Sequence, residues 1–220
     1  SMSLSIFGAH RETSMPHVVL FLLTSIAITV MPGPDNLQVV ARGASQGRKA
    51  GLSAAAGFAS GCLFHTTLAA LGLAAVLQSS PVAFQAIRWL GAAYLIWLGI
   101  QALRSKGSVG LNPAGPQAAP DLWRVYRQSV FANLLNPKVT LFFVVFLPQF
   151  VDAQAGHAAL QMLLLGGVFM AQTIVVFSIY GWSAAALGGW MRRTPRASLW
   201  LDRLSGCIFI GLGLRVALTK

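Results

Sequence analysis

Two charged residues stand next to prolines inside otherwise apolar stretches, and they are the strongest candidates for chemistry. Asp35 follows Pro34, and Lys138 follows Pro137. Charges placed this deep in apolar segments usually face the interior of a helix bundle and have a function, because each costs roughly 2.5–3.5 kcal/mol at the centre of a membrane helix. A carboxylate and an ammonium group together complement a zwitterion. We therefore predict that Asp35 binds an ammonium group or a proton and that Lys138 binds a carboxylate.

The backbone around both charges is predicted to be irregular. Proline has no N–H and clashes with the preceding turn, at a cost of about 3 kcal/mol or more inside a helix. The resulting helix ends favour a cation before the break and an anion after it. Neighbouring asparagines can supply orienting hydrogen bonds. The predicted substrate- or ion-binding residues are Pro32, Gly33, Pro34, Asp35, Asn36, Asn136, Pro137 and Lys138. Two alternatives stay open: Asp35 and Lys138 pair as a structural bridge, or Asp35 caps a helix at the membrane edge.

Five further residues are weaker candidates. His65 lies within an apolar run and is a candidate proton relay, because its pKa lies near neutrality; a hydrogen-bonded packing histidine is the alternative. Gly57 and Gly61 have the spacing of a close helix-packing face, which can also line a path. Gln149 and Gln172 are polar residues in or near apolar segments and are candidates for lining a cavity.

Long apolar runs must position these residues. Only 10% of the chain is charged and 55% is hydrophobic, whereas soluble domains carry about 25% charged residues. A bilayer core requires roughly 20 apolar residues of helix, and continuous apolarity without alternation excludes barrel strands. We predict an all-α polytopic membrane protein with about six transmembrane helices. They span residues 16–45, 50–77, 82–103, 123–150, 158–187 and 199–218, and the first and fourth are broken.

The same composition excludes several classes. The net charge of +11 suggests nucleic acid in a soluble protein, but here the basic residues are expected to set membrane topology. Cys62 and Cys207 share no metal-ligand or CxxC spacing and are expected to be packing residues. An intramembrane enzyme requires a nucleophile with a base, or a metal cluster, and the few scattered acidic and histidine residues do not supply one. No cofactor and no metal are expected.

A linker rich in glycine and proline divides the chain into two halves. We predict an N-terminal extension at 1–15, a first three-helix repeat at 16–103, a hydrophilic linker at 104–121 and a second repeat at 122–220. Placing the N-terminus outside puts eleven basic residues in inner loops and four outside. The positive-inside rule then predicts that both termini are outside.

The two halves share features at both ends. Arg88-x-x-Gly91 begins a pattern in the third helix that Arg203-x-x-Gly206 repeats in the sixth. Each half also begins with a helix interrupted by proline about 15 residues in. Three-helix units must enter the membrane from opposite sides, so the halves are predicted to be inverted copies. Inverted repeats with paired broken helices indicate a secondary transporter whose site lies at the repeat interface.

The order of these motifs resembles the LysE/RhtB family of amino-acid exporters. The resemblance is carried by Met-Pro-Gly-Pro-Asp-Asn-Leu at 31–37, Gly-Arg-Lys-Ala-Gly at 47–51, the Trp89–Gly99 run, Asn-Leu-Leu-Asn-Pro-Lys at 133–138 and Phe-Leu-Pro-Gln-Phe at 146–150. It covers nearly the whole chain from residue 16. It implies efflux of amino acids or their derivatives across the bacterial inner membrane, driven by protons, and favours the homoserine, threonine and neutral amino-acid branch. The implied partners are a zwitterionic substrate, protons and the lipid bilayer; association into homo-oligomers stays open.

Two other classes compete with an exporter. A channel or a non-transporting scaffold would share the apolar helices but would not show saturable, proton-coupled flux. The second competing class is an intramembrane enzyme. Uptake into inverted vesicles separates the exporter from both.

Overall fold

Helices form all the regular structure in the part of the chain that can be described. A computed structural model describes residues 14–105, 119–152 and 156–218. The predicted all-α membrane fold is confirmed. Most of the predicted extension at 1–15 and most of the linker at 104–121 lie outside the described residues. The elements in chain order are α1 (Ser14–Val30), α2 (Pro34–Gln46), α3 (Arg48–Leu68), the π-helical turn η1 (Ala69–Leu73), α4 (Ala74–Ser79), α5 (Pro81–Arg104), α6 (Leu122–Leu134), α7 (Pro137–Leu141), the π-helical η2 (Phe142–Phe146), the 3-10 turn η3 (Leu147–Phe150), α8 (Ala158–Arg193) and α9 (Pro195–Leu218).

The two predicted helix breaks are confirmed. The chain bends by 55° between α1 and α2, and by 50° between α6 and the segment that begins with α7. Pro34 and Pro137 are each the first residue of the helix that follows the break. Proline is favoured there, because its missing N–H has no helical partner at the start of a helix. Each proline therefore ends one helix and begins the next.

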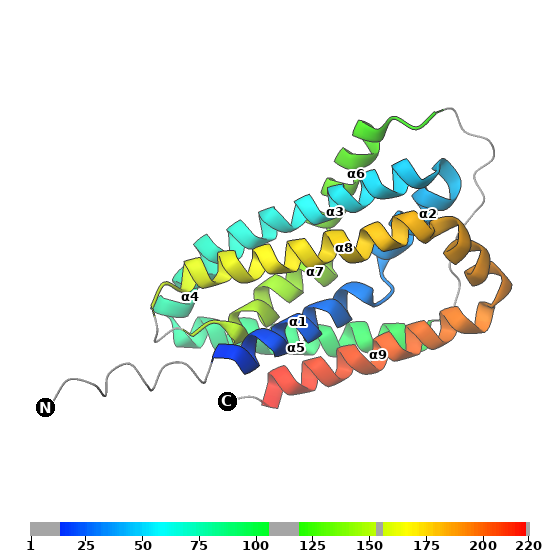
Figure 1. The fold of residues 1–220 in the computed structure, drawn as a ribbon. Coiled ribbons are helices and arrows are strands. Elements are labelled where there is room, and N and C mark those ends of the chain that lie inside the picture. Colours follow the sequence, from blue (N-terminus) through cyan, green and yellow to red (C-terminus); the bar gives the residue numbers. More distant parts are fainter. Residues whose placement is uncertain (1–13, 106–118, 153–155, 219–220) are drawn as a thin grey trace, which may run out of the picture.

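Length and composition identify three described helices as long and apolar enough to cross a membrane, and each bent pair can form one further span. α9 is 24 residues long but carries Asp202, Arg203 and Arg215, so its composition alone does not identify it as a span. It nevertheless lies alongside α5 over much of its length (Figure 1). The start of α1 and the end of α9 lie at the same end of the bundle (Figure 1), as an even number of crossings requires. The sixth span stays a prediction.

Glycines allow the long helices to approach closely. α3 lies against α8, and a Cβ atom on Gly181 would come within 2.7 Å of the Gly51 carbonyl carbon. Glycines do the same for α5 and α9: a Cβ on Gly206 would lie 2.7 Å from the Gly99 oxygen, and one on Gly213 would lie 2.9 Å from the Ala92 oxygen. Small residues at helix contacts are typical of membrane bundles. Gly206 of the repeated motif thus lies in the contact between α5 and α9, whereas its counterpart Gly91 lies against Val145.

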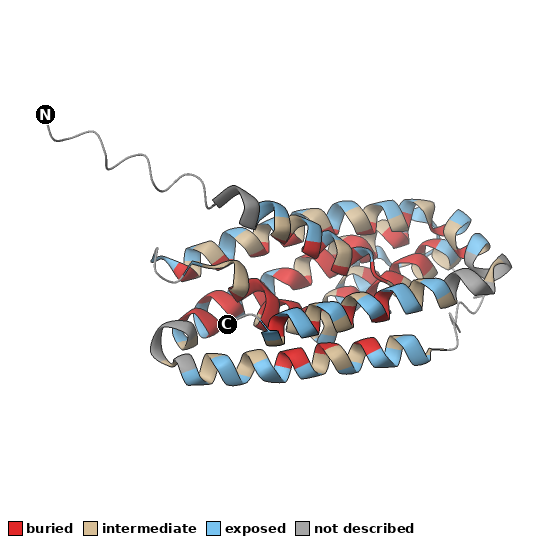
Figure 2. Ribbon diagram, turned by 90° about the horizontal axis from the view of Figure 1, so that it is seen from below, coloured by how far each residue is buried: buried red, intermediate tan, exposed pale blue. Residues whose placement is uncertain are grey.

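Burial follows the distance from the centre of the bundle. Figure 2 shows buried residues facing the interior of the bundle and exposed residues on the outward faces. A cluster of aromatic rings fills the core near the second break; its members are Phe21, Phe142, Phe143, Phe146, Phe150 and Phe169. Many large apolar side chains, such as Leu71 and Trp97, are exposed on the outer surface. Lipid tails are the expected neighbours of that surface.

Candidate functional site

The first break leaves carbonyl groups at the end of α1 without helical partners. In a continuous helix the Val30 oxygen would accept from residue 34, but Pro34 has no N–H. The Tyr180 hydroxyl on α8 donates to this oxygen instead, at 3.0 Å. The neighbouring Thr29 oxygen accepts from the Asn36 side-chain amide at 2.7 Å. Side chains thus replace the missing helical donors, as a membrane interior requires.

Lys138 supplies the third replacement donor. Its ammonium nitrogen lies 2.7 Å from the Met31 carbonyl oxygen at the end of α1. A cation is favoured at this end of a helix, where the helix dipole is negative. Gly33 leaves room for the lysine, since a Cβ on it would lie 3.3 Å from the Lys138 nitrogen. Lys138 therefore holds the first break together from the opposite half of the chain.

The second break is held in the same way. The Asn133 carbonyl would accept from residue 137 in a continuous helix, but Pro137 has no N–H. His65 Nε2 on α3 lies 3.2 Å from this oxygen, and the backbone N–H of Asn136 donates to it at 2.9 Å. The His65 side chain is buried and stacks on Phe143. His65 thus has the hydrogen bond of a packing histidine; its role as a proton relay stays a prediction.

The two breaks are capped reciprocally. Each proline deprives the carbonyl four residues earlier of its donor, and an aromatic side chain from the long helix of the other half supplies a donor. Tyr180 on α8 serves the break of the first half, and His65 on α3 serves the break of the second. This pattern is what two inverted copies would produce.

Removing the Tyr180 hydroxyl tests this capping. We expect Tyr180→Phe to lower stability by about 1–3 kcal/mol, because the Val30 carbonyl loses its donor at membrane depth. Thermal unfolding in detergent measures the change. Tyr94→Phe on α5 removes a hydroxyl of the same chemistry away from the breaks and should leave the unfolding temperature unchanged. Equal stability of the two variants would contradict the capping role.

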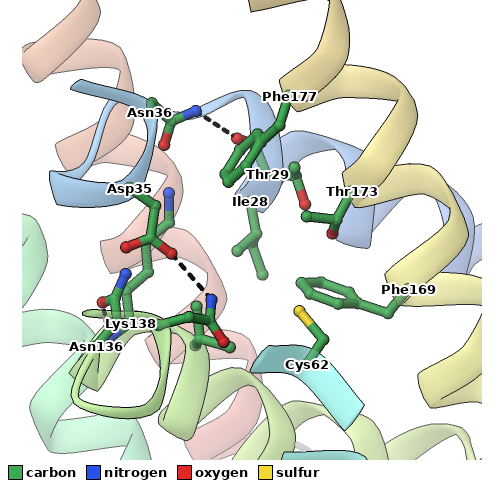
Figure 3. A pocket seen from close by; sticks show the side chains of 12 residues that line it. Ile28, Thr29, Asp35, Asn36, Cys62, Asn136, Lys138, Phe169, Thr173 and Phe177 are labelled. Atoms are coloured by element: carbon green, nitrogen blue, oxygen red, sulfur yellow. Dashed lines mark hydrogen bonds between the residues drawn. The ribbon is translucent and has the colours of Figure 1, made fainter. Parts of the chain in front are cut away.

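A cavity lies between the two breaks and the long helices α3 and α8 (Figure 3). Its volume is about 20 Å³, room for about one water molecule. It is lined by Ile28, Thr29, Asp35, Asn36, Cys62, Asn133, Asn136, Lys138, Val139, Phe169, Thr173 and Phe177. Four of the predicted binding residues, Asp35, Asn36, Asn136 and Lys138, are thus brought together around one cavity. The predicted residues Pro32, Gly33, Pro34 and Pro137 form the breaks without lining it.

The Asp35 carboxylate is the buried charge of this cavity. Its side chain is only 4% exposed, and its Oδ2 accepts from the Asn133 side-chain amide at 3.1 Å. Its Oδ1 is buried and makes no hydrogen bond of normal length with the described residues, although the Asn136 side-chain amide interacts with the carboxylate at longer range. In the part of the chain that the structure describes, Asp35 and Lys138 make no ion pair; the lysine donates to Met31 instead. One carboxylate oxygen is therefore left to accept from another group.

Two asparagines place further unpaired atoms near Asp35. Within the described ranges, Asn133 Oδ1 and Asn136 Nδ2 are buried without a hydrogen-bond partner. Asn136 Oδ1 caps α7 by accepting from the Lys138 backbone N–H at 3.0 Å, which fixes the side chain. A buried polar group without a partner costs about 1–3 kcal/mol, so such groups are retained where something else binds them. The cavity can bind a ligand that has both donors and acceptors.

The weaker candidates lie around the cavity but do not line it. Gly57 and Gly61 face α6, and a Cβ on Gly61 would lie 2.5 Å from the Asn133 side-chain oxygen. Gly61 therefore allows Asn133 to reach Asp35. Gln149 donates back to a backbone oxygen one turn earlier in the chain. Gln172 donates to the hydroxyls of Thr29 and Thr173, both of which line the cavity.

Sequence reasoning missed the part of the lining that α8 supplies. Phe169, Thr173 and Phe177 lie four residues apart on α8 and so share one helix face. That spacing is visible in the sequence, but many other faces of these apolar helices show it too. Asn133 had a stronger signal, because it lies four residues before Pro137, where the break frees a carbonyl.

Comparison with known proteins finds a matching family and several relatives. The family model described as "LysE type translocator" matches residues 26–220. A membrane protein of Vibrio cholerae, described as uncharacterized, is 33% identical over 205 residues, which cover 93% of this chain and 98% of the relative. A homoserine/homoserine lactone efflux protein of Salmonella typhimurium is 30% identical over 197 residues, covering 90% and 94% of the two chains. An uncharacterized membrane protein of Bacillus subtilis is 28% identical over 212 residues, covering 93% of this chain and all of the relative. No solved structure matches this chain.

Proposed function

The chain belongs to the LysE type translocator family, and we propose that it exports a small amino acid, or an amino-acid derivative, in exchange for protons. Membership of this family makes it a multi-pass membrane transporter rather than an enzyme. The name of the Salmonella relative suggests homoserine and its lactone as the first substrates to test.

One observation carries the proposal: in a cavity between two broken helices lies a buried carboxylate, one oxygen of which accepts no hydrogen bond within the described ranges. Asp35 Oδ1 and Asn133 Oδ1 can both accept from an ammonium group. Asn136 Nδ2 and the two N–H groups that Lys138 does not use on Met31 can donate to a carboxylate or a carbonyl. Complementary groups for both ends of an amino acid are thus available around one cavity.

The size of the cavity suggests how transport proceeds. It has room for about one water molecule, and a free amino acid is several times larger. The described cavity is too small for an amino acid, so binding requires the helices around it to move apart. Alternating access of this kind is usual when a site lies at the interface of inverted repeats.

Coupling to protons would arise because the proton and the substrate ammonium compete for the same Asp35 oxygen. Asp35 has one unpaired oxygen, and that oxygen can take a proton or the substrate ammonium, but not both together. A carrier that must carry one or the other across the membrane exchanges them. This exchange would drive efflux when the outside is more acidic.

The orientation in the membrane is part of the proposal. We place the chain in the bacterial inner membrane with both termini outside. The junctions between α2 and α3 and between α8 and α9 lie at the end of the bundle opposite the termini (Figure 1). Arg48 and Lys49 belong to the first junction, and Arg192, Arg193 and Arg196 to the second. Basic residues gather on the cytoplasmic side of inner-membrane proteins.

Uptake into inverted membrane vesicles tests this function. Efflux from the cell becomes uptake in such vesicles, and we expect saturable uptake of homoserine when the interior is made acidic. A protonophore should abolish accumulation, and vesicles from cells without the protein are the control. A channel would give flux that neither saturates nor accumulates substrate. Saturable uptake that ignores the pH gradient would refute proton coupling and leave the export function intact.

A further inference from the structure

The cavity has two chemically different ends. Figure 3 shows Asp35, Asn136 and Lys138 on one side of it, and Phe169 and Phe177 on the other. Ile28, Cys62 and Val139 are the other apolar residues of the lining. In the described lining no charged residue lies outside the polar end.

Resting on the proposed function, we infer that Phe169 determines which side chains the transporter accepts. The groups that can bind an ammonium and a carboxylate are confined to the polar end. A bound amino acid therefore directs its side chain toward the apolar end. The residue that closes that end sets how long the side chain can be.

Phe169 is held rigidly in that position. Its ring stacks on Phe142 with the ring centres 4.3 Å apart, and it meets Phe143 edge to face at 5.2 Å. The side chain is 3% exposed. A ring fixed by two aromatic neighbours cannot swing aside at little cost. Phe169 is therefore a fixed wall, against which a long side chain would collide.

The rest of the apolar end narrows the substrate class further. Cys62 is fully buried and contributes a small, weakly polar thiol. Phe177 is braced edge to face against Phe58. A charged side chain would lose its hydration here without gaining a partner, which is strongly unfavourable. The Thr29 and Thr173 hydroxyls, both contacted by Gln172, can meet a single side-chain hydroxyl. The predicted class is amino acids with short, uncharged side chains, with or without one hydroxyl.

Counterflow in proteoliposomes tests this inference. Homoserine, leucine, phenylalanine and lysine are each offered to the wild-type protein and to Phe169→Leu. We expect the wild type to favour homoserine and Phe169→Leu to raise the ratio of leucine to homoserine transport at least about tenfold. Lysine should stay excluded in both. The matched control is Phe146→Leu, which removes a ring from the same aromatic cluster without touching the cavity; its ratio should match the wild type.

A second variant keeps the inference testable if Phe169→Leu does not fold. Cys62→Ala enlarges the same end without disturbing the ring stack and should shift the ratio in the same direction, by less. If Phe169→Leu and Cys62→Ala both transport homoserine with an unchanged ratio of leucine to homoserine transport, the inference is wrong. The proposed function would then still stand. A wild-type protein that carries none of the four amino acids would overturn the proposed function and the inference with it.

Discussion

Replacing Asp35 with asparagine should reduce transport about 10- to 100-fold while the protein still reaches the membrane. The variant keeps the shape of the side chain but removes the one carboxylate in the described cavity lining, which is the proposed partner of the substrate ammonium. A hydrogen bond to a charged group contributes about 1.5–3 kcal/mol, and about 1.4 kcal/mol corresponds to a factor of ten. Proton exchange should also disappear, because an amide does not take up the proton. Initial rates in inverted vesicles, normalised to the amount of protein, measure both effects.

The control for this variant makes the same chemical change elsewhere. Asp202 lies on α9, outside the cavity, and accepts a hydrogen bond from Ser105. Asp202→Asn should therefore keep its proton-coupled transport. Full activity of Asp35→Asn at equal protein amounts would show that transport does not depend on the buried carboxylate, wherever the substrate binds.

Gly181→Ala should lower the stability of the bundle by about 1–3 kcal/mol or more, because it inserts a methyl group into a filled contact. The added Cβ would lie 2.7 Å from the Gly51 carbonyl carbon and 3.0 Å from the Leu52 backbone nitrogen. Backbone atoms cannot move aside as a side-chain tip can, so α3 and α8 must separate. Since both helices line the cavity, transport should fall as well. Thermal unfolding should show a loss of roughly 2–12 °C.

Gly167 provides the matched control on the same helix. A Cβ there would meet nothing within 4 Å, and alanine is a better helix former than glycine by about 1 kcal/mol. Gly167→Ala should therefore unfold at the same temperature or slightly higher. A stable Gly181→Ala protein would show that the two helices are packed less tightly than the structure describes.

Local sequence rules predicted the breaks well. Proline acts on its own backbone and on the preceding turn, so the positions of Pro34 and Pro137 suffice to place both interruptions. Asp35, Asn36, Asn136 and Lys138 were found for the same reason, since each lies within two residues of a proline. The family resemblance, confirmed by the family match over residues 26–220, needed only the order of these motifs.

The partners of these residues could not be predicted, because they depend on how whole helices are rotated. Asp35 accepts from a residue 98 positions away, and Val30 from one 150 positions away. Phe169 reaches the cavity only through the rotation of α8, and the apolar sequence of that helix does not single out one face. Lys138 illustrates the limit: the sequence shows its charge but not its contact with the Met31 carbonyl.

The reciprocal capping of the breaks has a consequence for the order in which the protein is made. When the first broken helix is synthesised, Tyr180 does not yet exist, because it lies 150 residues downstream of Val30. The Val30 carbonyl must therefore stay hydrated, or at the edge of the insertion machinery, until α8 arrives. The second break has no such delay, since His65 precedes Asn133 by 68 residues. The break in the first half is thus the last to receive its hydrogen-bond donor. A chain released before residue 180 leaves the Val30 carbonyl without that donor.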